Sequence, residues 1–258
     1  MLENPFVLAF IISLCINLFF FVLAYGLQTD KFTDFTYGLT FIILILYLTI
    51  ANQAYSLAQI IVSAMIIIWA IRLISYLLIR ILKIKKDSRF DDKRSNILSF
   101  LQFWIFQGLA VFTIMLPSIY LITQPKVVEI NPLMVLGILT WLIGIVVESL
   151  SDKQKFKFKN NPQNKNLWIQ SGLWKYSRHP NYFGEVLCWW GIFILTLPFT
   201  QGLSLLTIIG PIFITFILLF VSGIPPLEKR YDSKYAKNKK YQEYKKKTSI
   251  LIPLPPKK

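Results

Sequence analysis

Seven long apolar stretches dominate this 258-residue chain and constrain its fold more than any other feature. Each is close to the roughly 20 residues that a helix needs to cross the apolar core of a bilayer. The stretches cover about residues 6–25, 36–55, 57–80, 98–122, 132–150, 183–199 and 203–222. We therefore predict an all-α, multi-pass transmembrane helical bundle of about seven spans. Because every loop is too short to fold separately, residues 1–258 are expected to form a single integral membrane domain.

The basic residues indicate how this bundle is oriented. Of the 28 Lys and Arg residues, 24 lie in the segments 83–97, 151–181 and 224–258, and Lys126 is the only basic residue in the loops that alternate with them. Basic loops stay on the cytoplasmic side, so we predict an outside N-terminus and a cytoplasmic C-terminus. The membrane would be of the bacterial inner or endoplasmic reticulum type. The net charge of +15 then reflects topology, and no nucleic-acid partner is expected.

Cysteine and histidine are too few for a metal centre or a disulfide framework. Cys15 and Cys188 both fall inside apolar stretches, and His179 is the only histidine. Carboxylates are too scattered to replace histidine ligands, so no metal site is predicted.

The segment 172–185 is unusually polar for a stretch that runs directly into an apolar span. It holds a cation, an imidazole, an amide and a carboxylate: Arg178, His179, Asn181 and Glu185. Such groups are costly to desolvate unless they bind something, which favours a binding site. Asn181 and Glu185 are four residues apart and share one face of the entering helix. Trp174 and Tyr176 are expected to be interfacial anchors instead.

A second polar group lies at the inner end of the fifth span. Glu148, Asp152, Lys155 and Lys159 follow one helical stripe. For the residues of this stripe nearest the helix end, ion pairs between side chains on a solvent-exposed helix surface are as good an explanation as a binding role. Together with the segment 172–185, the stripe suits an anionic ligand with an aromatic head, such as a nucleotide cofactor. The chain has neither a Gly-x-Gly-x-x-Gly nor a Walker sequence, so the cofactor would bind between helices.

At these positions the chain resembles the DUF1295 group of membrane proteins. That group is similar to the C-terminal domain of steroid 5-alpha-reductases and, more distantly, to sterol C14 and C7 reductases. The resemblance is carried by the following motifs: Trp69-Ala70-Ile71-Arg72-Leu73, Asp87-Ser88-Arg89-Phe90, the stripe from Glu148 to Lys159, the stretch from Ser171 to Gly191, Leu227-Glu228 and Tyr241-Gln242-Glu243-Tyr244.

The resemblance implies an NADPH-dependent reductase of a C=C bond in a lipid-soluble enone or sterol-like substrate. The residues that we predict to bind the cofactor all lie in the C-terminal half, 132–258: Asp152, Lys155, Lys159, Arg178, His179, Asn181, Tyr182, Glu185 and Tyr231. Asn181 and Glu185 would line the nicotinamide side, and Asp152 and Lys159 the adenosine-phosphate side. Trp69 stands where the steroid reductases carry their proton-donating tyrosine. Candidate donors in this chain are Tyr47, Tyr55 and Tyr76.

Two other functions compete with the reductase. Isoprenylcysteine and phospholipid methyltransferases hold S-adenosylmethionine with a similar Arg-His-Pro-x-Tyr-x-Gly motif, which this chain matches from Arg178 to Gly184. They usually carry a Glu-Glu pair in the tail, where this chain has only Glu228. Asn181 and Glu185 favour the reductase. The third possibility is a lipid-binding membrane protein without catalytic activity.

The predicted topology can be tested by cysteine labelling. In a chain whose own two cysteines are replaced, a cysteine after Lys258 should react only with reagents that reach the cytoplasm, because basic loops stay inside. A cysteine before Leu2 should react only with external reagents. Labelling of both ends from the same side would contradict the odd number of spans.

Overall fold

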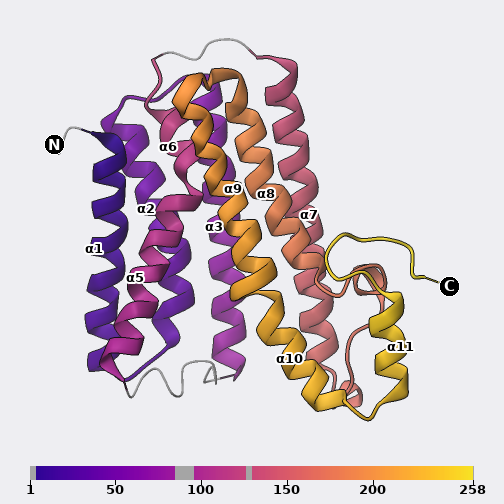
Figure 1. The fold of residues 1–258 in the computed structure, drawn as a ribbon. Helices are drawn as coiled ribbons and strands as arrows, with labels where there is room; N and C mark the ends of the chain where they lie inside the picture. The colour runs from indigo at the N-terminus through magenta and orange to yellow at the C-terminus, as the bar shows by residue number, and fades with distance from the viewer. Residues whose placement is uncertain (1–3, 85–95, 126–129, 258) are drawn as a thin grey trace. The chain divides into compact units, whose positions relative to one another are not determined.

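The computed structural model describes residues 4–84, 96–125 and 130–257, and 81% of these described residues are helical (Figure 1). No strand occurs among the described residues. Seven of the described helices are long and apolar enough to cross a membrane. The prediction of an all-α fold with seven candidate spans is therefore confirmed.

The chain divides into two compact units. The first comprises Met1–Val135 and Ile192–Gly210, and the second comprises Leu136–Gly191 and Pro211–Lys258. Each unit is thus assembled from two separate parts of the sequence. The motifs that the sequence singles out between Glu148 and Tyr244 all fall in the second unit.

The described residues of the first unit include the helices α1 (Pro5–Gly26), α2 (Lys31–Ala51), α3 (Leu57–Ile84), α5 (Ile97–Ile114) and α6 (Leu116–Ile122). Helix α1 packs against α2 and α5, and α2 packs against α3. The apolar run 98–122 was predicted as one span, but it is divided at Met115. Pro117 lies in the first turn of α6, where its missing N–H removes a hydrogen bond that a continuous helix would need.

Polar side chains join α1 to α5 inside the first unit. The Gln107 amide donates to Asn17 Oδ1 at 3.0 Å, and the Ser13 hydroxyl donates to the Gly108 carbonyl at 2.7 Å. All three side chains are buried. Hydrogen bonds of this kind fix the register of helices whose surroundings are uniformly apolar.

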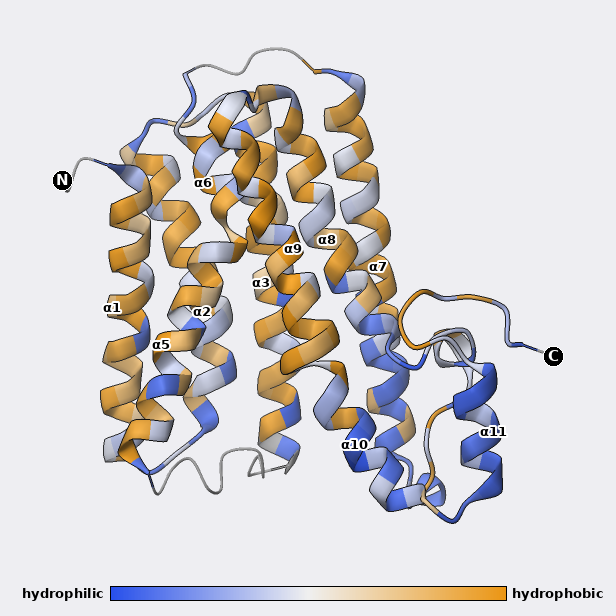
Figure 2. Cartoon of the chain, in the orientation of Figure 1, coloured by the Kyte–Doolittle hydropathy of each residue, from blue (hydrophilic) through white to orange (hydrophobic). Residues whose placement is uncertain are grey.

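The second unit contains most of α7 (Pro132–Asn160), α8 (Pro180–Thr196) and α9 (Ile209–Phe216). It also contains the π-helical turn η6 (Ile217–Val221), α10 (Ile224–Tyr235) and α11 (Lys239–Lys247). Hydrophilic residues gather on α10, α11 and the last turns of α7 (Figure 2). The predicted last span, 203–222, ends before Gly223. Pro225 and Pro226 then open the first turn of α10, a position where proline needs no N–H partner.

Glycines bring α7 and α8 into close contact. A Cβ atom built on Gly184 would lie 2.5 Å from the Glu148 nitrogen and 2.6 Å from the Gly144 carbonyl oxygen. Two turns along the antiparallel pair, a Cβ on Gly191 would lie 2.7 Å from the Gly137 carbonyl oxygen. Small residues allow this approach of two backbones in a membrane protein. The contact places the polar end of α7 beside the start of α8.

Substitution of Gly184 should disturb this contact. Because the new methyl group would meet backbone atoms, which cannot move aside as a side chain can, Gly184→Ala should destabilise the protein by about 1–3 kcal/mol. Gly26→Ala is the matched control, since a Cβ there has no atom within 4 Å. Melting temperatures in detergent would measure both effects. Equal melting temperatures for the two variants would contradict the close contact.

Candidate functional site

The loop between α7 and α8 sets the position of the polar motif. It contains the short 3-10 helix η3 (Gly172–Lys175), and Gly172 has a φ of +62°, which favours glycine. The Gln154 side chain of α7 accepts a hydrogen bond from the Leu173 N–H at 3.0 Å. Helix α8 begins at Pro180, so Arg178 and His179 lie just before its first turn.

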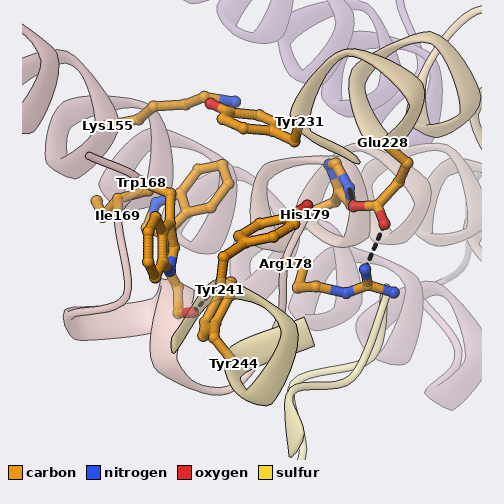
Figure 3. A pocket seen from close by; sticks show the side chains of 10 residues that line it. Lys155, Trp168, Ile169, Arg178, His179, Glu228, Tyr231, Tyr241 and Tyr244 are labelled. Atoms are coloured by element: carbon orange, nitrogen blue, oxygen red, sulfur yellow. Dashed lines mark hydrogen bonds and ion pairs between the residues drawn. The ribbon is translucent and has the colours of Figure 1, made fainter. Parts of the chain in front are cut away.

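Glu228 of α10 joins the two residues that precede α8. The Arg178 guanidinium donates to its Oε2, and the His179 Nε2 lies 2.9 Å from its Oε1 (Figure 3). Lys245 Nζ of α11 is 3.4 Å from Oε2 of the same carboxylate. Glu228 is therefore the centre of a cluster that ties α10 and α11 to the loop before α8.

The His179 imidazole is almost completely buried. Burial lowers its pKa below the ordinary value of 6.5, although the hydrogen bond with Glu228 opposes this shift. The ring is therefore neutral at physiological pH. Because a carboxylate can only accept, we assign the proton to Nε2, which leaves Nδ1 as a hydrogen-bond acceptor.

A pocket in the second unit has this cluster on one side. Its lining side chains come from α7, the loop before α8, α10 and α11: Lys155, Trp168, Ile169, Trp174, Arg178, His179, Glu228, Tyr231, Tyr241 and Tyr244. Half of these side chains are aromatic. The pocket thus combines flat apolar surfaces with charged groups.

Aromatic contacts hold the wall of the pocket together. The Trp168 ring meets the Tyr235 and Tyr241 rings edge to face, with centroids 5.2 and 5.3 Å away. Lys155 Nζ lies 4.5 Å from the centre of the Trp174 ring, a cation–π contact. The Tyr244 hydroxyl donates to the Trp174 carbonyl at 2.7 Å. Burial raises the pKa of Tyr241 and of Tyr244, so both phenols keep their protons.

Three buried polar atoms around the pocket lack a hydrogen-bond partner among the described residues. They belong to lining side chains: the Trp168 Nε1, the Arg178 Nε and the His179 Nδ1. Buried polar groups are nearly always satisfied, by protein, water or ligand. Two donors and one acceptor are therefore available to a bound molecule.

The structure brings together some of the predicted cofactor residues but not all. Lys155, Arg178, His179 and Tyr231 line the pocket. The remaining five are not among its described lining side chains: Asp152, Lys159, Asn181, Tyr182 and Glu185. Asp152 is buried within α7, and Lys159 is exposed near the end of that helix. The Tyr182 ring stacks on His179 with centroids 5.7 Å apart.

The prediction for Trp174 is wrong. The residue was expected to anchor the chain at the membrane interface, but its side chain is only 3% exposed. Its Nε1 donates to the Ser151 carbonyl of α7 at 3.0 Å. Tyr176, the other expected anchor, is 40% exposed. The loop folds back onto α7, and this tertiary contact draws the indole inward.

Sequence reasoning missed several residues of the pocket. Glu228 lies some fifty positions from Arg178 and His179, and neither Trp168 nor Tyr241 was predicted to be a site residue. The motifs Leu227-Glu228 and Tyr241-Gln242-Glu243-Tyr244, which carry the family resemblance, were the available signals for Glu228 and Tyr241.

Other sequence predictions fall elsewhere in the chain. Tyr47, Tyr55 and Tyr76 lie in the first unit. The motif Asp87–Phe90 lies outside the described residues. Among the residues that the structure describes, no group of three or more His, Cys, Asp or Glu side chains is placed to hold a metal ion.

The buried histidine should make stability depend on pH. Because folding holds His179 neutral, the unfolded chain binds more protons below pH 6.5, and stability falls as the pH decreases through this value. For one proton, the free energy of unfolding can change by about 1.4 kcal/mol per pH unit. Melting temperatures between pH 7.5 and 5.5 should therefore decrease in the wild type and change less in His179→Gln. An equal decrease in both proteins would contradict this role of His179.

The comparisons with known proteins assign the chain to a family. No curated protein and no solved structure matches it significantly. The model of the family described as "Protein of unknown function (DUF1295)" matches residues 20–248, which is most of the chain. This family is associated with the sterol reductase and methyltransferase superfamily, which suggests an enzyme similar to steroid 5-alpha-reductase. The chain belongs to the DUF1295 family.

Proposed function

We propose that the protein is an NADPH-dependent membrane reductase of a C=C bond in a lipid-soluble enone or sterol-like substrate, with its site on the cytoplasmic side. The observation that carries this proposal is the pocket of the second unit. There Lys155 and the Arg178–Glu228 ion pair lie beside five aromatic side chains. Cations suit phosphates and aromatic faces suit a heterocycle, which are the two parts of a nucleotide.

The charge around the pocket favours an anionic cofactor. The segments 151–181 and 224–258 together carry eighteen Lys and Arg residues against four carboxylates. A strongly positive region raises the local concentration of anions. NADPH carries three phosphate groups, whereas S-adenosylmethionine carries none and has a positive sulfonium. The electrostatics therefore support NADPH over S-adenosylmethionine.

The available hydrogen-bonding atoms fit such a cofactor. A carboxamide or an adenine presents both donors and acceptors, and Trp168 Nε1 and His179 Nδ1 could satisfy one of each. Lys155 and Arg178 would hold phosphate oxygens. When bound, NADPH supplies the hydride that reduces the C=C bond. Glu228 would hold Arg178 and His179 in fixed positions before the cofactor binds. The two side chains would then lose less conformational entropy on binding.

A methyltransferase is the second candidate. The observation that favours it is the contact of Glu228 with both Arg178 and His179. This carboxylate lies in the tail, where the similar methyltransferases carry their Glu-Glu pair. The two candidates differ in cofactor, and a binding measurement separates them.

Cofactor binding can be tested by thermal stabilisation of detergent-purified protein. NADPH should raise the melting temperature by mass action, because it binds the folded chain alone, and S-adenosylmethionine should not. Lys155→Met should weaken NADPH binding by roughly tenfold, the effect of losing a charge-assisted hydrogen bond. Oxidation of NADPH with a panel of enones would then test the reaction.

Lys153→Met is the matched control for this experiment. Lys153 is exposed on the same helix and is not one of the described pocket residues. Lys153→Met removes the same positive charge as Lys155→Met, two positions away. If only the overall charge mattered, both variants would therefore weaken NADPH binding equally. Stabilisation by S-adenosylmethionine alone would reject the reductase and support the methyltransferase.

A further inference from the structure

The segment 248–257 lies along the loop that carries Arg178 and His179. The Arg178 N–H donates to the Ser249 carbonyl at 2.8 Å, and the Leu254 N–H donates to the Tyr176 carbonyl at 3.1 Å. Ser177 and Ser249 form a parallel β-bridge. Two stretches some seventy residues apart in sequence are thus joined backbone to backbone.

Ser177 makes a second connection through its side chain, which is fully buried. Its hydroxyl donates to the Leu251 carbonyl at 2.7 Å and accepts from the His179 N–H at 3.1 Å. One hydroxyl group therefore links the segment 248–257 to the backbone of His179. The same hydroxyl satisfies a backbone N–H just before the start of α8.

Both residues that follow Ser177 contact Glu228 through their side chains. Their backbone N–H groups are in turn bonded to Ser249 and to the Ser177 hydroxyl. Without the segment 248–257, the Arg178 N–H would lose its partner, and the Ser177 hydroxyl would lose its acceptor. A loop that is released by even about 1 Å no longer presents its side chains in a productive geometry.

We propose that Ser177 is a positioning residue and that the segment 248–257 is a structural part of the pocket, holding Arg178 and His179 against Glu228. The identity of the ligand rests on the proposed function, but the positioning itself does not. A positioning role predicts that a substitution of Ser177 alters the pocket by changing the position of His179.

The only histidine of the chain provides a direct measurement. In protein purified without a histidine tag and labelled with ¹⁵N-histidine, every imidazole signal belongs to His179. The wild type should show a proton on Nε2 and a pKa below 6.5, because the ring is buried against Glu228. In Ser177→Ala the ring should become more mobile and hydrated, and its pKa should move toward 6.5. NADPH binding should weaken roughly two- to tenfold, the cost of one lost hydrogen bond.

Ser171→Ala is the matched control. Ser171 is an exposed serine of the same loop, and its side chain makes no capping hydrogen bond. It should leave the His179 titration unchanged. Circular dichroism would verify that each variant is folded. If Ser177→Ala does not fold, Ser177→Cys, whose thiol bonds only weakly, should still move the His179 pKa from its wild-type value toward 6.5.

The outcomes separate the two proposals. An unchanged His179 titration in a folded Ser177 variant would overturn the positioning role, whatever the cofactor. A wild type that does not bind NADPH would overturn the proposed function, while the titration would still decide the role of Ser177. A shift in both Ser177→Ala and Ser171→Ala would also overturn the proposal, since it would mean that any change in the loop disturbs His179.

Discussion

A carboxylate largely withdrawn from water needs partners, and Glu228 has three of them. Removing charges from water costs several kcal/mol for each ion, and only good geometry and additional hydrogen bonds offset this cost. Arg178, His179 and Lys245 supply that geometry from the loop and from α11. The arrangement of the whole polar end of the second unit follows from this requirement, because loop, α10 and α11 must meet where the carboxylate lies.

The glycine contact between α7 and α8 also helps to position the residues around Glu228. Since Gly144 and Gly184 let the two backbones touch, the side chains at the polar end of α7 reach the loop before α8. Lys155 can then lie over Trp174, whose indole bonds back to Ser151. The contact between the apolar parts of α7 and α8 thus fixes the geometry of the pocket, which lies at the polar end of the same unit.

The sequence was most informative where one local property decides the structure. Apolar length predicted the helices, since a bilayer imposes it directly. The break at Met115 was missed because one proline divides a run that remains apolar on both sides. In the pocket, Arg178 and His179 stood out by their position before a span. Glu228 did not, because its role depends on a contact between distant segments, and Trp174 was misread for the same reason.

The order of synthesis gives the segment 248–257 a further significance. A ribosome makes these residues after all seven apolar helices, which can enter the membrane one after another as they emerge. The hydrogen bonds that the Ser249 and Leu251 carbonyls accept from Arg178 and Ser177, in the loop before α8, can form only later. A nascent chain would therefore hold its helices in the bilayer while its pocket was still incomplete. Membrane insertion and the completion of the pocket are separate events in the formation of this protein.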